Sequence, residues 1–524
     1  MKPRQGDPER RRHVSDTQAM SGGFSTLLLP EPELRFGNDG TDTDPKRGLT
    51  LYGPSDLGTP GHRNQVRVGI VGTDTTVEQA IGWLEECAMP IEGVSGKLRQ
   101  MPHFPGFHPD ATFRSQFVTQ DRWQQRLAGP ELRAIFDSPD RRTRFEEAVA
   151  RFARKVQLIA ELDDKPDVIL CALPQEIVDA CRSIGPKDTR AGGSRAMTPL
   201  ERLLEKAAKS GQMTFLEQLF GLGESDQTQL VYRTFRRALK ARVMRWDVPV
   251  QLAQPRLFEG GPEVQDKATR AWNFCVGMYF KAKGTPWKLA EVEPGTCFVG
   301  VSFYHHVTEA SRTVHSSLAQ VFTDQGEGIV LRGEKFEWDP DAQGRSPHLT
   351  EEHARNLIQH AIEKCREYTG TLPRRVVLHK TSRYWPEELR GFEAGLAGVH
   401  EYDLVALYQT GVRFFREGQY PPLRGTLCSF SNQAHFLYTL GYIPFLETYP
   451  RGHVPEPLEI VQHIGGSSTR RVCQEILALT KMNWNSAEYA GGMPITLRFA
   501  RRVGEIMSEI PESETPKPSY RFYM

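Results

Sequence analysis

Short apolar runs alternate with helix patterns along most of this chain. Residues 66–71 form one such run before a helix pattern at 75–87, and residues 167–172 form another before one at 175–181. Strands that alternate with helices favour a parallel sheet with helices packed on its faces. Because 524 residues exceed what one hydrophobic core usually holds, we expect two α/β domains with a boundary near residue 289.

Composition and termini limit the class of protein. Lys and Arg together number 66 and Asp and Glu 65, so the net charge does not by itself indicate a polyanionic partner. No apolar run is long enough to span a membrane, and residues 1–22 lack the apolar core of a secretory signal. The eight cysteines form no CxxC pair, which favours buried, reduced thiols. We therefore expect a cytoplasmic protein with a disordered tail at residues 1–27.

Basic residues are concentrated between residues 227 and 246, where the pattern predicts a helix without acidic residues. A spacing of three or four residues puts several of them on one helix face, where like charges repel each other. A bound polyanion would remove that repulsion, whereas a solvated basic face is the simpler interpretation. The six basic residues are Arg233, Arg236, Arg237, Lys240, Arg242 and Arg245.

Two later segments add polar groups to this basic helix. The strand pattern that follows it carries Gln251, and the next helix pattern ends with Lys281 and Lys283. An Arg side chain makes bidentate contacts with phosphate, a Lys supplies a point charge and a Gln supplies a neutral donor. Together these residue types suit one terminal phosphate group.

A glycine-rich turn at residues 68–73 follows the first strand pattern. It has neither the GxGxxG pattern of dinucleotide-binding turns nor the GK[ST] ending of a phosphate loop. We interpret it as a tight strand-to-helix turn with Asp74 or Thr75 as the N-cap. This interpretation disfavours a self-contained nucleotide-binding enzyme.

The order of short motifs along the chain resembles the MID–PIWI core of Argonaute proteins, and specifically the short prokaryotic clade. The resemblance covers residues 28–524 approximately, and its specificity comes from the order of the segments, since each one alone is weak. The matching segments are 31–37, 48–54, 68–73, 104–107, 167–174, 236–241, 248–251, 281–289, 376–380, 449–460 and 480–485.

The resemblance implies a Rossmann-like MID domain at residues 28–289 that anchors the 5′-phosphate of a guide strand. One position of the family's pattern, often a Lys, falls on Gly277. The family's C-terminal carboxylate, here that of Met524, helps to hold a Mg²⁺ ion against the guide phosphate together with Gln251. The phosphate-binding positions fall on Arg236, Lys240, Gln251 and Lys281, with Lys283, Arg233 and Arg237 as supporting cations.

The resemblance also implies a ribonuclease-H-like PIWI domain at residues 290–524. Its catalytic positions fall on Ser302, Thr381 and Arg501, and its glutamate position falls in the region of Glu327 and Glu334. Cleavage of a phosphodiester in this fold needs several carboxylates to hold two metal ions. We therefore expect no cleavage and no enzymatic activity from this chain, because a guide-dependent DNA nuclease would need the missing carboxylates.

Short Argonautes are similar in having a partner protein with an APAZ region. The partner carries the effector, a TIR or sirtuin-type NAD hydrolase or, less often, a nuclease. The resemblance thus implies a subunit that binds a 5′-phosphorylated guide RNA, pairs it with invading single-stranded DNA and activates its partner, with NAD depletion and arrest of the infected cell as the result. We expect Mg²⁺ but no NAD to bind this chain, and a higher oligomer to form on activation.

Overall fold

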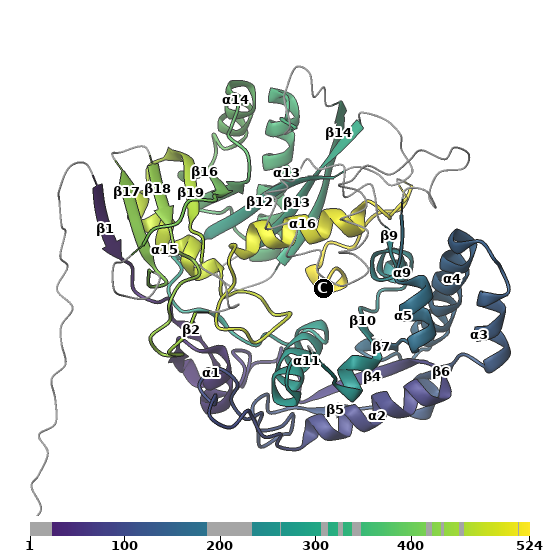
Figure 1. Cartoon of the computed structure of the whole chain (residues 1–524). Helices are drawn as coiled ribbons and strands as arrows, with labels where there is room; N and C mark the ends of the chain where they lie inside the picture. The colour runs from purple at the N-terminus through teal and green to yellow at the C-terminus, as the bar shows by residue number, and fades with distance from the viewer. Residues whose placement is uncertain are drawn as a thin grey trace, which may run out of the picture.

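The chain folds into two lobes, each built around a β-sheet (Figure 1). No helix in the part of the chain that the structure describes is long and apolar enough to cross a membrane. The structure is a computed structural model, and it describes residues 24–185, 233–262, 264–304, 313–322, 328–337, 347–415, 422–430, 434–449, 455–511 and 513–524.

The first lobe has a parallel sheet with strand order β10-β7-β4-β5, and a short strand β6 also pairs with β4. The two central strands are buried along almost their whole length, as expected where helices cover both faces. The sequence-based prediction of a parallel sheet is therefore confirmed. The strands are β4 (Gln65–Gly72), β5 (Gln116–Val118), β6 (Gln124–Arg126), β7 (Val168–Ala172) and β10 (Val250–Ala253).

Helices cover both faces of this sheet. Helices α2 and α11 pack on one face, whereas α4, α5 and α9 pack on the other. The N-cap of α2 is Thr73 and not Asp74 or Thr75, because the extended Thr73 accepts a hydrogen bond from the Thr76 N–H group. The helices are α1 (Pro45–Tyr52), α2 (Asp74–Ala88), α3 (Gly129–Phe136), α4 (Arg141–Ala160), α5 (Gln175–Cys181), α9 (Phe235–Val243), α10 (Pro255–Glu259) and α11 (Lys267–Lys281).

The second lobe has a nine-stranded sheet with the order β1-β17-β18-β19-β16-β15-β12-β13-β14. Strands β12, β15 and β16 are parallel at its centre, and the other neighbours are antiparallel. The strands are β1 (Phe24–Leu28), β12 (Thr296–Tyr304), β13 (Thr313–Phe322), β14 (Gly328–Glu337), β15 (Arg375–Lys380), β16 (Glu401–Gln409), β17 (Thr426–Phe430), β18 (Ala434–Leu437) and β19 (Leu458–Gly465).

Two pairs of helices sandwich the second sheet. Helices α13 (Glu351–Thr369) and α14 (Pro386–Gly395) pack on one face (Figure 1). Helices α15 (Thr469–Leu479) and α16 (Ile495–Met507) pack on the other, in a hydrophobic core that continues to α2 and α11 of the first lobe. One continuous core therefore holds the two lobes together.

Strand β1 corrects the expected end of the N-terminal tail. It pairs antiparallel with β17, with Phe24 opposite Phe430 and Leu28 opposite Thr426. Residues 24–27 are thus part of the second sheet, and the expectation of disorder up to residue 27 is wrong for them. The sequence did not reveal this, because the pairing partner lies far along the chain.

A small three-stranded sheet joins residues 29–64, which precede β4 and which we call the lead-in segment, to the end of the first lobe. Strand β2 (Leu34–Arg35) pairs with β3 (Thr41–Asp42) and with β11 (Lys288–Leu289). The chain then enters the nine-stranded sheet at Thr296, a few residues beyond the boundary expected near residue 289.

Candidate functional site

Helix α9 is shorter than the sequence predicts. The pattern indicated a helix over 227–246, whereas α9 begins at Phe235 after Thr234, whose side chain accepts a hydrogen bond from the Arg237 N–H group. Arg233 lies in the short strand β9 (Arg233–Thr234), which pairs with β8 (Ser183–Ile184), and residues 227–232 lie outside the described residues. Arg233 therefore does not share a helix face with the later basic residues.

Two basic side chains of α9 contact main-chain carbonyl groups. Arg236, which is partly buried, donates from Nη2 to the carbonyl of Tyr523 at 3.0 Å. Lys240, one turn later, is 2% exposed and donates from Nζ to the carbonyl of Val250 at 2.8 Å. Neither of these two carbonyl contacts provides a negative charge, although buried cations are usually paired with one.

Lys281 ends α11 and is buried beside these residues. Its side chain is 1% exposed, and its Nζ atom has no hydrogen-bond partner in the described part of the chain. Burial, together with the positive charges of Arg236 and Arg502, lowers the pKa of Lys281 to about 7. An ammonium group buried in this way is costly, and an anion would supply the missing partner.

Arg502, on α16 of the second lobe, adds its positive charge to the surroundings of Arg236 and Lys281. Burial and the charge of Arg502 are the two largest influences that lower the pKa of Arg236, to about 10. The sequence did not point to Arg502, because the expectation for this helix concerned only the metal-binding position at Arg501. The packing of α16 decides which of its arginines faces the first lobe, and no sequence pattern shows that.

Positive charge is in excess at this site, which we call the basic pocket. Burial, followed by the charges of Lys281 and Arg236, lowers the pKa of Lys240 well below its ordinary value. The acid that acts on Arg236 is Glu505, and Glu505 already ion-pairs with Arg237 at 2.7 Å. The basic pocket consists of Arg236, Lys240, Lys281 and Arg502.

The predicted neutral donor and the C-terminus border the basic pocket. Gln251 lies on β10, next to the carbonyl that Lys240 contacts, and its Nε2 atom donates to the Leu252 carbonyl at 3.0 Å. The C-terminus lies between α11 and α16 (Figure 1), and Met524 is buried. Four of the predicted phosphate ligands and the chain end are thus brought to one region.

The three supporting cations are not part of the basic pocket. Arg233 ion-pairs with Glu146 and, at 2.8 Å, with Glu509, and Arg237 is paired as described above. Lys283 is exposed and follows α11 with a positive φ of 74°. Tertiary packing thus supplies Arg233 and Arg237 with carboxylates that the local sequence lacks, and their supporting role at a phosphate stays a prediction.

The positions that correspond to catalytic carboxylates lie on the face of the second sheet covered by α16. The last pair between β12 and β15 is Gly300 with His379, and β15 ends at Lys380, so Ser302 and Thr381 both lie just beyond the paired part of these two strands. Ser302 is 1% exposed. On α16, Arg501 forms an ion pair with Glu505 at 3.8 Å.

Lys380 points to the opposite face of the sheet. Its Nζ atom lies 2.5 and 2.7 Å from the two carboxylate oxygens of Glu388 on α14, and both side chains are fully buried. Alternation along β15 separates it from Thr381. Lys380 therefore does not contribute charge beside Ser302.

The carboxylate expected near β14 does not face Ser302 either. Glu334 accepts a hydrogen bond from Asn356 of α13 at 3.2 Å, on the face opposite α16, and Glu327 lies outside the described residues. Among the residues that the structure describes, no three His, Cys, Asp or Glu side chains form a group that could hold a metal ion.

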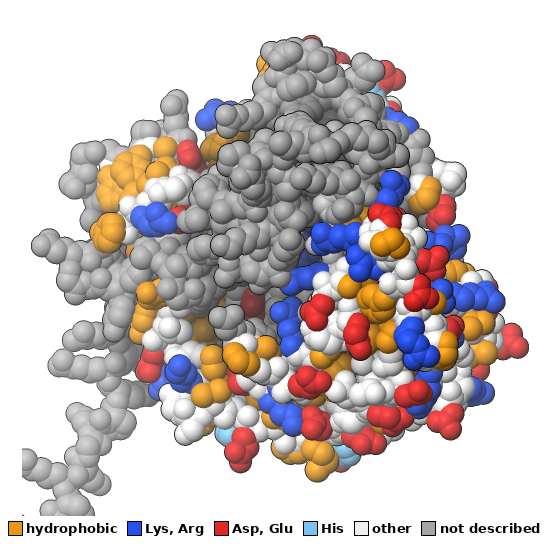
Figure 2. Space-filling model, turned by 45° about the vertical axis from the view of Figure 1, so that its right-hand side comes forward, with side chains coloured by type: hydrophobic (Ala, Val, Ile, Leu, Met, Phe, Trp, Pro, Cys, Tyr) orange, Lys and Arg blue, Asp and Glu red, His pale blue; other side chains and the backbone are white. Residues whose placement is uncertain are grey.

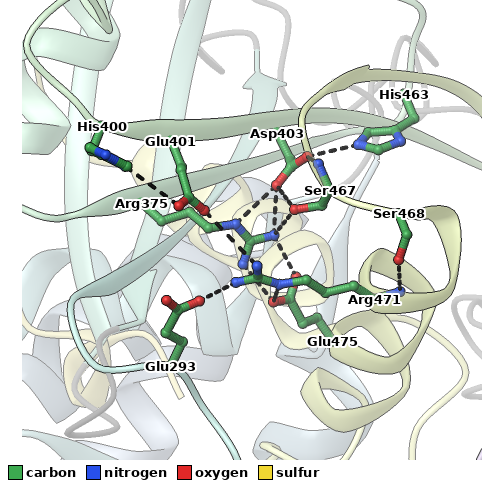
Figure 3. Close-up of polar contacts among 10 residues, drawn as sticks. All are labelled: Glu293, Arg375, His400, Glu401, Asp403, His463, Ser467, Ser468, Arg471 and Glu475. Carbon is green, nitrogen blue, oxygen red and sulfur yellow. Dashed lines mark hydrogen bonds and ion pairs between the residues drawn. The ribbon is translucent and has the colours of Figure 1, made fainter.

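A separate buried ion network lies at the other end of β15 (Figure 3). Arg375, the first residue of β15, donates to Asp403 at 2.6 Å and to Glu475 at 2.5 Å. Asp403 also accepts hydrogen bonds from His463 at 2.8 Å and from the Ser467 hydroxyl at 2.7 Å. The network joins β15, β16, β19 and α15. Each oxygen of the Asp403 carboxylate already accepts hydrogen bonds, so we assign the network a structural role.

The fold is that of the MID and PIWI portion of Argonaute proteins, the second half of which is ribonuclease-H-like. No protein-family model matches the sequence, and no curated protein matches it. The likeness is therefore one of fold, and it covers almost the whole chain.

Three solved structures illustrate this likeness. Clostridium butyricum Argonaute bound to a guide DNA and a 19-mer target DNA has a TM-score of 0.57 and 12% identity, over 94% of this chain and 54% of that one. A. aeolicus Argonaute has a TM-score of 0.53 and 13% identity over the same shares. Drosophila Piwi has a TM-score of 0.52 and 12% identity, over 95% and 56%. The chain thus spans about half the length of the Argonautes it matches.

Proposed function

We propose that this chain binds a guide RNA by its 5′-phosphate. The observation that carries the proposal is the basic pocket, in which the buried Lys281 has no hydrogen-bond partner among the described residues and lies between cations from both lobes. A terminal phosphate carries up to two negative charges and several acceptor oxygens, so it would supply both the charge and the hydrogen-bond acceptors that the pocket lacks. Lys and Arg side chains also form a band on the surface shown in Figure 2, where a phosphate backbone would gain favourable contacts.

We further propose that the bound guide pairs with single-stranded DNA and that pairing activates an APAZ-containing partner, a TIR or sirtuin-type NADase. The proposal that the chain senses the target without cutting it is supported by three residues, none of which is a carboxylate: Ser302, Thr381 and Arg501. Base pairing reads the sequence, while protein contacts go to the backbone. Activation of the partner requires that the guide–target duplex bind the active state of the complex more tightly than its inactive state.

The donor groups fit a Mg²⁺ ion at the guide phosphate. We propose the amide oxygen of Gln251, which lies next to the carbonyl that Lys240 contacts, and a carboxylate at the buried Met524 as its ligands. A Cβ atom at Gly277, one turn before Lys281, would have its nearest neighbour at 3.9 Å, so space remains where the family often has a Lys. Bound there, the ion would neutralise repulsion between the carboxylate and the phosphate, and it would keep several of its waters.

Binding of matched RNAs tests the proposed function. Guide-free protein should bind a 5′-phosphorylated RNA at least about tenfold more tightly than the same RNA with a 5′-hydroxyl, since tenfold corresponds to one charge-assisted hydrogen bond. The measurement is the ratio of the two Kd values, in Mg²⁺ and in EDTA. Equal affinity for the two RNAs would contradict the proposal.

The double variant Lys240→Ala, Gln251→Ala should lose the small RNA that co-purifies with the chain. It removes one charged and one neutral donor, each on the order of 1–3 kcal/mol. The measurement is the nucleic-acid content of the purified protein. The exposed Lys283→Ala variant serves as the control and should keep its RNA, and unchanged RNA in the double variant would count against the pocket.

Restoring one carboxylate should not restore cleavage. The Ser302→Asp variant, loaded with guide and given matched DNA with Mg²⁺ or Mn²⁺, should leave the DNA intact, because Thr381 and Arg501 remain and two metal ions need several carboxylates. Gel analysis of the DNA is the readout. Site-specific cleavage by this variant, or by the unaltered chain, would overturn the assignment of a non-cutting sensor.

A further inference from the structure

The matching segment 480–485 begins a loop whose role the proposed function leaves open. The loop spans residues 480–491 between α15 and α16, and the Gly491 N–H group donates to the Thr480 carbonyl at 2.8 Å, which closes it. Near its start, the buried Lys481 lies 2.7 Å from Glu31 and donates to the Thr43 carbonyl at 2.6 Å. The loop is therefore anchored to the lead-in segment, and its remaining residues can act as a fixed support.

The middle of the loop packs along α11. The Trp484 ring is fully buried, with its centroid 4.5 Å from that of Phe280. The Trp484 carbonyl is the atom nearest to the Cβ position of Gly277, and the Ala487 N–H group donates to Asn273 at 2.9 Å. These contacts follow successive turns of the helix that ends at Lys281, so the loop sets where that end of α11 lies.

The same loop contacts the C-terminal segment. The Asn485 Nδ2 atom donates to the Tyr520 hydroxyl at 3.4 Å, and the buried Tyr520 ring stacks on Phe499 of α16 at 3.7 Å between centroids. Tyr520 begins the short turn that leads to Tyr523, whose carbonyl accepts the hydrogen bond from Arg236. The loop thus touches both the helix that carries Lys281 and the segment that orients Arg236.

We propose that Trp484 and Asn485 are positioning residues that set the distance between Lys281 and Arg236 in the basic pocket. The inference rests on the proposed function, since it assigns these two residues a part in 5′-phosphate recognition. Neither residue needs to touch the RNA. A displacement of the two cations by about 1 Å weakens the contacts of both with one phosphate, because charge-assisted hydrogen bonds depend steeply on geometry.

The test compares two loop variants with a matched control. Trp484→Leu and Asn485→Ala should lower the ratio of the Kd values for 5′-hydroxyl and 5′-phosphate RNA by about tenfold or more, as expected for misplaced ligand groups. The Kd for 5′-hydroxyl RNA should change little. Trp123→Leu is the control, since Trp123 is also fully buried but lies in the first lobe away from the loop, where its indole N–H group donates to the Asp164 carbonyl.

The outcomes separate a positioning role from general destabilisation. Loss of phosphate preference in the loop variants but not in Trp123→Leu supports the inference, even where their Tm values fall equally. An unchanged ratio in folded loop variants, or an equal loss in the control, overturns it. If Trp484→Leu does not fold, the milder Asn485→Ala variant decides. Absence of phosphate preference in the unaltered protein would instead refute the proposed function itself.

Discussion

Replacing Lys281 by Met is expected to stabilise the guide-free chain and to abolish its preference for a 5′-phosphate. Met fills a similar volume without a charge, so it removes a buried ammonium group that has no hydrogen-bond partner in the part of the chain that the structure describes. An unsatisfied buried polar group costs about 1–3 kcal/mol, and the free energy of unfolding should rise by about that amount. Denaturant unfolding of nucleic-acid-free protein measures this gain, and RNA binding measures the loss.

The increase in the free energy of unfolding caused by Lys281→Met should depend on pH. The pKa of Lys281 is about 7 in the folded chain, below its ordinary value of 10.5, so the folded state binds fewer protons than the unfolded state between these values. The stability of the unaltered protein therefore rises with pH across this window through this group. The advantage of Lys281→Met should be largest below pH 7 and should vanish near pH 10.5.

The exposed Lys283→Met variant is the matched control for Lys281→Met. It removes one positive charge two residues away, and it should change neither the free energy of unfolding nor the phosphate preference by a measurable amount. A Lys281→Met variant that is less stable than the unaltered chain at pH 7 would show that the ammonium group has a partner of opposite charge. The basic pocket would then not be poised for an anion.

Replacing Arg375 by Met should destabilise the chain by about 3–5 kcal/mol, the usual cost of removing one partner of a buried ion pair. The change leaves the buried Asp403 and the adjacent Glu475 without their shared cation. None of these residues belongs to the basic pocket, so the ratio of RNA affinities should not change. Denaturant unfolding and RNA binding of the same preparation provide the two measurements.

The half-exposed Arg471→Met variant controls for the loss of an arginine in the same network. Arg471 is 35% exposed at its side chain and pairs with Glu475 at 3.3 Å, and exposed pairs contribute about 0–1 kcal/mol. Equal destabilisation by Arg375→Met and Arg471→Met would contradict the assignment of Arg375 as the buried centre.

Acid unfolding gives an independent check on this network. Burial alone would raise the pKa of Asp403, but hydrogen bonds from His463, Ser467 and Arg375 hold it well below the ordinary value of 3.8. The unaltered chain should therefore lose stability as the pH falls below that value, since protons bind the unfolded state first. Arg375→Met should show a shallower loss.

Local patterns predicted the central strands and most helices because their signals are short-range. The apolar runs at 66–71 and 167–172 became β4 and β7, and the helix pattern at 75–87 became α2. The N-cap was misplaced by one or two residues because β4 ends at Gly72 and the next residue, Thr73, already caps the helix. Strand β1 was missed because its partner, β17, is distant in the sequence.

The candidate site was predictable only in part. Arg236, Lys240, Gln251 and Lys281 were found from their types and order, whereas Arg502 was not. The carboxylate partners of Arg233 and Arg237 were not predicted. The local sequence around them contains no acid, and only packing brings Glu505 and Glu509 of α16 against α9.

The sequence by itself determined the α/β class, the order of the two lobes and the absence of carboxylates at Ser302, Thr381 and Arg501, because each of these follows from residue type and local periodicity. The tertiary structure alone decided which cations are paired and which are not. Burial and charge balance depend on groups that are distant along the chain, so Lys281 is buried beside the charges of Arg236 and Arg502 only once α9, α11, α16 and the C-terminal segment have packed together.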